Sequence, residues 1–122
     1  MIPFFTIDSD QLFVRNYEQV TVETTKETTT HKVKRLTYQY FGEDAPQAVR
    51  VFKCESGLRP DAESHTNDHG VAQINLTSHA AKIPASDKVA WLRNPENNIK
   101  LALQLFIHSG WNPWNSSKGC WG

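Results

Sequence analysis

Glu55 is the residue whose sequence neighbours most clearly indicate chemistry. Ala48, Val51 and Phe52 precede it by seven, four and three positions, so on a helix all three would share its face. A glutamate on an apolar face is desolvated, and in the last turn of a helix it also meets the negative end of the helix dipole. Both effects raise the pKa and favour a carboxyl group that stays protonated near neutral pH, as a general acid requires. The alternative is a glutamate at the rim of the core, whose stem packs while its carboxylate stays in water.

Histidines and acidic residues downstream of Glu55 do not form a metal-binding pattern. His65 and His69 are four positions apart, but they lie in a segment with Gly and Asn, and no carboxylate completes a zinc pattern. The nearby acidic residues do not follow the EF-hand pattern, and the chain has no Gly-rich phosphate loop. We therefore expect no metal and no cofactor. The balance of 13 basic and 13 acidic residues argues against a nucleic-acid partner, which needs a cationic excess.

Helices are expected to position these residues. The sequence predicts a helix over residues 47–56, with Asp44 as N-cap and Gly57 just past its end. A longer helix is expected from Pro95 to Gly110, because its apolar residues recur with i, i+3, i+4, i+7 spacing. Shorter helices are expected near residues 77–83 and 86–92. The predicted fold class is α+β, mainly α, in a chain of 122 residues with no apolar run long enough to span a membrane.

Residues 1–40 differ in composition from residues 41–122. They hold eight of the ten threonines and no Gly, Trp or Cys. Partial alternation of Val with Thr and charged residues predicts one or two half-exposed strands, with a β-ribbon around residues 28–30. The alternative is a polar linker. We therefore expect a Thr-rich N-terminal segment that ends at residue 40 and a separate domain that begins at residue 41.

Four segments of that domain resemble, in the same order, motifs of lysozyme-like lytic transglycosylases and of related bacterial and phage lysozymes. Each motif alone is weak, whereas the ordered set is specific. The segments are residues 54–62 (CESGLRPDA), 70–75 (GVAQIN), 94–102 (NPENNIKLA) and 110–114 (GWNPW).

The resemblance implies a lysozyme-like fold with a small region of strands and loops, and peptidoglycan as the partner. The bond cleaved would be the β-1,4 link between N-acetylmuramic acid and N-acetylglucosamine. Glu55 matches the catalytic acid of this family. Asp68, in the segment DHGVAQIN, matches the aspartate that acts as nucleophile or charge stabiliser in animal-type lysozymes, although only 13 residues separate it from Glu55 here. Its alternative is a solvated turn aspartate before Gly70.

The chemistry implied by the resemblance has two forms. Many lytic transglycosylases have no second carboxylate, and in these the glutamate acts first as acid and then as base while the 6-hydroxyl of muramic acid closes a 1,6-anhydro ring. Lysozymes hydrolyse the same bond with water. A third possibility is a non-catalytic glycan-binding or structural module that retains the cleft, and all three stay open at this point.

Several polar and aromatic residues are candidates for binding the glycan. Gln73 and Asn75 stand at alternate positions of an apolar stretch, which suits hydrogen bonds to N-acetyl and hydroxyl groups in a cleft; their alternative is backbone capping in a tight loop. Ser64 and Asn98 are weaker candidates, by position only. Trp111 could stack on a sugar face, although we expect it mainly in the core or the cleft wall.

Cys54 and Cys120 are the only cysteines, and their number alone leaves a disulfide and two buried thiols equally open. The resemblance favours the disulfide, because an enzyme that degrades cell walls acts where disulfides persist. It also implies an extracytoplasmic location, secreted, periplasmic or virion-associated, although the N-terminus does not look like a signal peptide.

Overall fold

The structure is a computed structural model that describes residues 26–122. Most of this part of the chain is helical, and its strands form one short antiparallel pair. The expected class, α+β and mainly α, is therefore confirmed. The elements in chain order are α2 (Thr29–Phe41), η1 (Gly42–Asp44), α3 (Ala45–Ser56), β1 (Asp68–His69), β2 (Ile74–Asn75), α4 (Leu76–His79), η2 (Ala80–Lys82), α5 (Lys88–Arg93), α6 (Pro95–Ser109), η3 (Asn112–Ser117) and α7 (Lys118–Trp121).

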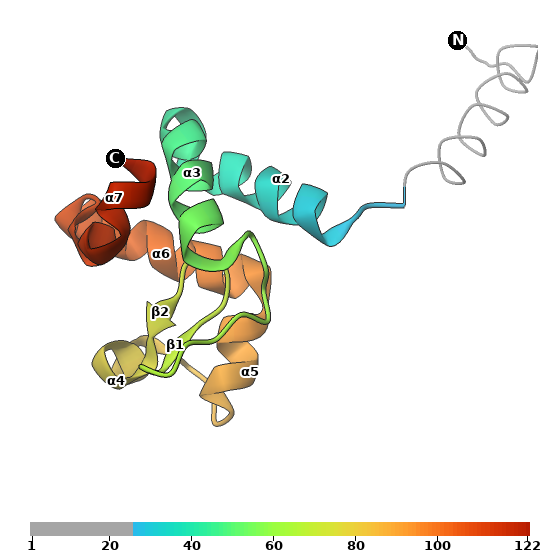
Figure 1. The fold of residues 1–122 in the computed structure, drawn as a ribbon. Helices are drawn as coiled ribbons and strands as arrows, with labels where there is room; N and C mark the ends of the chain where they lie inside the picture. Colours follow the sequence, from blue (N-terminus) through green and yellow to red (C-terminus); the bar gives the residue numbers. More distant parts are fainter. Residues whose placement is uncertain (1–25) are drawn as a thin grey trace, which may run out of the picture.

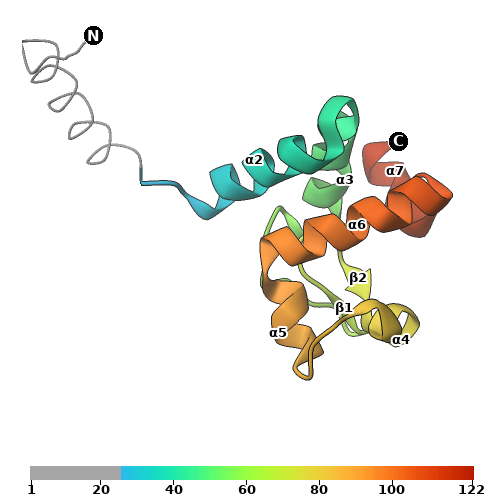
Figure 2. The ribbon, with the colours of Figure 1, turned by 180° about the vertical axis from the view of Figure 1, so that it is seen from behind.

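The elements fall into two groups with α6 between them. Figure 1 shows α2, α3 and α7 on one side of α6, and the strands with α4 and α5 on the other. The view from behind in Figure 2 shows the same division. Helix α3 runs toward the strands, so its last turn, which contains Glu55, lies at the border between the two groups.

Helix α3 forms where the sequence predicts it. Its buried face consists of small and branched apolar residues at helical spacing, together with Phe52. Gly57 ends the helix with a left-handed φ of 66°, and its N–H bonds the carbonyl of Lys53. The predicted cap at Asp44 is correct in position but not in mechanism. Its side chain caps nothing because the chain enters α3 directly from the helical turn η1.

The expected ribbon around residues 28–30 is wrong, because the chain is helical from Thr29 onward. Thr28 caps α2 by accepting a hydrogen bond from the His31 N–H at 3.1 Å. Val33 and Leu36 are buried, and α2 packs against both α3 and α6. This tertiary packing outweighs the preference of Thr and Val for strands. The remaining residues of the predicted strands, up to residue 25, lie outside the described part of the chain.

Helix α6 is the longest described helix and begins as predicted. The Asn94 side chain accepts a hydrogen bond from the Asn97 N–H at 3.0 Å, and Pro95 occupies the first turn. Ile99, Ala102 and Leu105 are buried along one face. The helix ends at Gly110, and the expected short helices correspond to α4 with η2 and to α5. None of the helices described is long and apolar enough to cross a bilayer.

The disulfide favoured by the resemblance is present. Cys54 in α3 is bonded to Cys120 in α7, with their Cα atoms 6.1 Å apart and their positions separated by 66 in the chain. The Gln47 side chain adds a hydrogen bond to the Trp121 carbonyl at 3.4 Å. The end of the chain is therefore fastened to the helix that carries Glu55.

Candidate active site

Glu55 lies in the last turn of α3 and is only partly exposed. The apolar residues that share its helix face, Ala48, Val51 and Phe52, are completely buried. One carboxyl oxygen, Oε2, accepts a hydrogen bond from the Ser117 hydroxyl at 2.5 Å. Within residues 26–122 the other oxygen, Oε1, has no hydrogen-bond partner. One oxygen is therefore held by the protein and the other is not.

The environment of Glu55 favours its protonated form. Burial raises the pKa of Glu55 above its ordinary value, and this is the largest influence. The Ser117 hydrogen bond lowers the pKa and the negative charge of Asp68 raises it, and the net direction is upward. The raised pKa expected from the helix pattern is confirmed in direction. It suits a group that must deliver a proton at neutral pH.

Asp68 lies in β1, directly opposite Asn75 in β2. Three side chains donate hydrogen bonds to its carboxylate. Ser64 and Thr66 donate to Oδ2 at 2.6 and 2.5 Å, and Asn75 donates to Oδ1 at 2.9 Å. Burial acts to raise the pKa of Asp68, but these hydrogen bonds together outweigh it, so that the pKa lies below its ordinary value. Asp68 is therefore an ionised carboxylate held in a fixed orientation.

The two carboxyl groups thus have opposite protonation preferences. Glu55 is shifted toward the neutral acid and Asp68 toward the anion, and the charge of Asp68 contributes to the shift at Glu55. Glycoside-cleaving sites use such a pair, in which one group donates a proton and the other stabilises positive charge on the sugar.

A groove runs away from Asp68 along α4 and the second half of α6. It begins in a small cavity of about 80 Å³. A cavity of about 400 Å³ adjoins it and shares His79, Leu105 and Pro113 with it. The small cavity is lined by Asp68, Gln73, Ile74, Asn75, His79, Leu105, Pro113 and Trp114. An extended ligand lying over Asp68 could continue into the larger space.

The predicted ligand-binding residues have more internal bonds than the sequence suggested. Asn75 caps α4 by accepting a hydrogen bond from the Ser78 N–H at 2.9 Å. Its amide nitrogen donates to Asp68 Oδ1 and to the Thr66 carbonyl. The Gln73 amide group donates to the carbonyls of Ala62 and Gly70, at 3.1 and 3.0 Å. Both residues line the small cavity. Their hydrogen bonds favour the interpretation that both side chains cap backbone groups of the loop. Ser64, the third candidate, donates a hydrogen bond to Asp68.

Asn98 is completely buried and does not line the groove. Its Oδ1 accepts from the Ala72 N–H at 2.8 Å, and its Nδ2 donates to the carbonyls of His69 and Leu92, each at 2.9 Å. Every hydrogen-bonding group of the side chain is therefore used, and none can reach a sugar. The interpretation of Asn98 as a binding residue gives way to a structural one, in which it fastens the loop after β1 to α6.

Replacing Asn98 with alanine should destabilise the protein by about 3 kcal/mol or more. The change leaves three buried backbone groups without a partner, and each costs about 1–3 kcal/mol when unsatisfied. Thermal unfolding followed by circular dichroism measures the loss. Gln104→Ala on the exposed side of the same helix is the matched control and should change the stability by less than about 0.5 kcal/mol. Equal melting temperatures for the two variants would refute this role of Asn98.

Trp111 is part of an aromatic cluster. Its ring is parallel to that of Phe41, with centroids 6.1 Å apart, and lies 4.4 Å from the ring of Phe106. Trp114 meets it edge-on at 5.5 Å. Trp111 does not line either cavity of the groove. This packing favours the core interpretation over a sugar-stacking platform.

Ser117 and Thr66 belong to the site but were not among the predicted residues. Ser117 is 62 residues from Glu55 in sequence, and no local pattern reveals that the two meet. Thr66 is two positions from Asp68, a spacing at which a hydroxyl can bond a carboxylate in a turn. The sequence thus carried a signal for Thr66 and none for Ser117.

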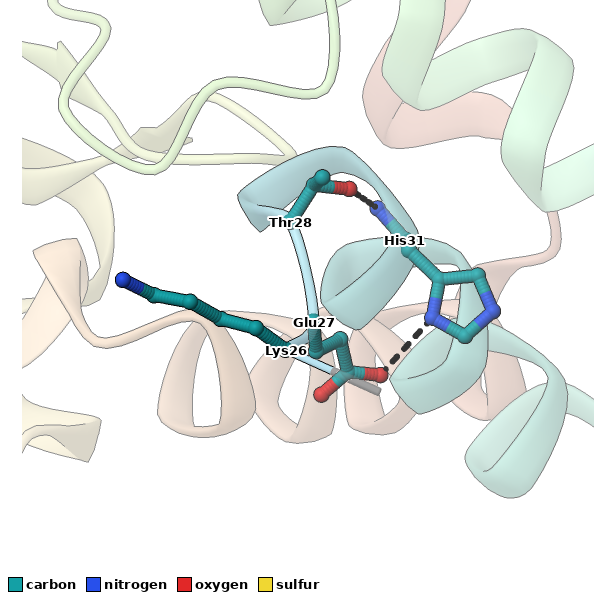
Figure 3. Close-up of a pocket in the computed structure, with 4 residues that line it drawn as sticks. All are labelled: Lys26, Glu27, Thr28 and His31. Atoms are coloured by element: carbon teal, nitrogen blue, oxygen red, sulfur yellow. Dashed lines mark hydrogen bonds and ion pairs between the residues drawn. The ribbon is translucent and has the colours of Figure 1, made fainter. Parts of the chain in front are cut away.

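A separate cavity of about 590 Å³ lies at the start of α2 and is lined by Lys26, Glu27, Thr28 and His31. Figure 3 shows that Glu27 and Thr28 both bond to His31. Arg35 also pairs with Glu27, and its hydrogen bond and charge, together with those of His31, lower the pKa of Glu27 to about 2. Hydrogen bonds thus join Glu27, Thr28, His31 and Arg35 to one another, and none joins them to Glu55. Within residues 26–122 no cluster of His, Cys, Asp and Glu could hold a metal ion.

The family model described as the transglycosylase SLT domain matches residues 34–114, which include α3, both strands and α6. No curated protein and no solved structure matches the chain.

Proposed function

Because the chain belongs to the transglycosylase SLT family, whose activity is lytic cleavage of peptidoglycan, we propose that Glu55 is its general acid. The bond cleaved is the β-1,4 link from N-acetylmuramic acid to N-acetylglucosamine. The observation that carries this proposal is the state of Glu55. Its pKa is raised by burial, one oxygen is held by Ser117, and Asp68 lies close enough for its charge to act on Glu55. The location of the substrate makes the site of action extracytoplasmic.

In the first step Glu55 donates its proton to the glycosidic oxygen. The bond from this oxygen to C1 of muramic acid breaks, and positive charge develops on C1 and the ring oxygen. Asp68 is held ionised by Ser64, Thr66 and Asn75, and its negative charge stabilises that cation. In the second step an oxygen atom forms a new bond to C1 and gives its proton to the Glu55 carboxylate, which regenerates the acid. This oxygen belongs to the 6-hydroxyl of the same muramic acid in transglycosylation and to a water molecule in hydrolysis.

Mass spectrometry of peptidoglycan fragments tests the proposal and separates the two outcomes. Purified peptidoglycan is incubated with the wild-type protein, and the ends of the muramic acid residues are analysed. Anhydro ends, lighter by one water than reducing ends, indicate transglycosylation, and reducing ends indicate hydrolysis. Binding to peptidoglycan without any cleavage would contradict the proposal and favour a non-catalytic glycan-binding module.

Asp68→Asn should slow cleavage by about 10²-fold, because the neutral amide cannot stabilise the cation. The pH profile should also change. The pKa of Asp68 is lowered in the folded protein. The wild type should therefore lose activity through protonation of Asp68 only below the ordinary carboxyl range. Asp68→Asn has no carboxyl group at this position and should lack this acidic limb of the pH–rate profile. Initial rates measured from acidic to neutral pH test this. Asp61→Asn, at an exposed carboxyl group in the loop that precedes β1, should retain the wild-type profile. A wild-type rate for Asp68→Asn would leave Glu55 as the acid and remove Asp68 from the mechanism.

We further propose that the catalytic unit includes α2. This helix crosses the boundary expected between residues 40 and 41 and packs against α3 and α6, and the family match begins at residue 34.

A further inference from the structure

The hydroxyl group of Ser117 lies among three polar groups. Its oxygen is 2.5 Å from Glu55 Oε2 and 3.1 Å from the Trp114 carbonyl oxygen. The Trp121 indole N–H donates to it at 3.0 Å. Ser117 is only partly exposed. The cluster connects the last turn of α3 with η3 and α7, and it lies next to the Cys54–Cys120 disulfide in sequence.

The hydrogen-bonding capacity of these groups limits the possible arrangements. The indole N–H can only donate and the carbonyl can only accept, whereas a hydroxyl has one proton and two lone pairs. When Glu55 is ionised, the Ser117 proton is donated to the carboxylate. The Trp121 N–H is then also within reach of the Trp114 carbonyl, at 3.3 Å. When Glu55 is protonated, its own O–H can donate to Ser117, and the Ser117 proton turns to the Trp114 carbonyl. Both states are satisfied without movement of a heavy atom.

We propose that Ser117 is a positioning residue whose hydroxyl rotates between Glu55 and the Trp114 carbonyl as Glu55 loses and regains its proton. The inference rests on the proposed role of Glu55. A glutamate that acts first as acid and then as base must be held in one position in both states, and a partner that can both donate and accept does this. No covalent bond of Ser117 forms or breaks. Oε1 of Glu55 stays free for proton transfer to the glycan, because Ser117 bonds Oε2.

Ser117→Ala tests the proposal. The Ser117 hydrogen bond lowers the pKa of Glu55, so its removal should raise that pKa further. Since the protonated acid is the active form, the alkaline limb of the pH–rate profile should shift to higher pH. The rate at the optimum should fall by up to about 10²-fold, because the carboxyl group loses its fixed orientation. Ser117→Thr retains a hydroxyl and should keep the wild-type limb. Ser116→Ala, at the exposed neighbouring position, should match the wild type in both rate and profile.

Trp121→Phe provides a second test. The ring remains in the aromatic cluster, but the N–H that donates to Ser117 is lost. The hydroxyl then becomes a poorer donor to Glu55, and the alkaline limb should shift in the same direction as in Ser117→Ala, by a smaller amount.

A readout that does not require activity separates this inference from the proposed function. The ¹³C chemical shift of the Glu55 carboxyl group, followed by NMR against pH, gives its pKa in the wild type and in Ser117→Ala. A higher pKa in the variant supports the role of Ser117, even if the wild type only binds the glycan. An unchanged pKa, or a slower variant with an unmoved alkaline limb, would mean that Ser117 only supports the fold and would overturn the inference.

Discussion

Glu55→Gln should lower the rate of peptidoglycan cleavage by about 10³-fold, the contribution expected of a general acid. Glutamine fills the same space and can accept the Ser117 hydrogen bond through its carbonyl oxygen, but it has no acidic proton to donate to the glycosidic oxygen. Glu63→Gln, at an exposed carboxyl group in the loop after α3, is the matched control and should cleave at the wild-type rate. Release of soluble fragments from purified peptidoglycan measures both variants.

Glu55→Gln should not lower the stability of the fold. The pKa of Glu55 is raised in the folded protein, so the charged form is less favourable there than in the unfolded chain. The contribution of Glu55 to the free energy of unfolding is therefore full below the pKa of the unfolded chain. It is lost gradually as the pH rises through the pKa of the folded protein. Glutamine removes that loss, and Glu55→Gln should unfold at the same temperature as the wild type or higher near neutral pH. An inactive variant that melts as well as the wild type assigns the loss to chemistry, whereas an active variant would refute the assignment of Glu55.

The parts of the site that lie within one helix could be predicted from the sequence. The burial pattern of α3 and the raised pKa of Glu55 follow from residues three, four and seven positions apart. The limits of α6 follow from the signals at Asn94 and Gly110. The number of cysteines leaves the disulfide open, and only the family resemblance, which implies an oxidising compartment, favours it.

The parts that depend on distant contacts could not be predicted. Helix α2 contains several Thr, Val and aromatic residues, which prefer strands. It is helical because Val33 and Leu36 find a buried surface on α3 and α6. Asn98 looks like a polar residue at a helix start, and only the backbone of a loop 26 residues earlier explains it. Ser117 reaches Glu55 across 62 residues. Local patterns contain no information about such contacts.

Removal of the Cys54–Cys120 disulfide should strongly destabilise the fold. The bond closes a loop of 66 residues, which corresponds to about 4 kcal/mol in the chain-entropy model. The double variant Cys54→Ser/Cys120→Ser should therefore melt well below the wild type. Thermal unfolding of the wild type with and without reductant provides the same comparison without mutation. The double variant itself should not respond to reductant, and a wild type that melts equally in both conditions would contradict the prediction.

The same bond should matter for catalysis below the melting temperature. Helix α7 has only four residues, too few to be stable alone, and it carries the Trp121 indole that bonds Ser117. Without the disulfide this helix is held to α3 mainly by packing and by the Gln47 hydrogen bond. We expect the reduced protein, assayed while still folded, to lose activity and to show the alkaline shift expected of Ser117→Ala. Loss of activity without that shift would mean that the disulfide does not act on Glu55 through Ser117. The same shift in both proteins would show that the disulfide both stabilises the fold and keeps Ser117 in place on Glu55.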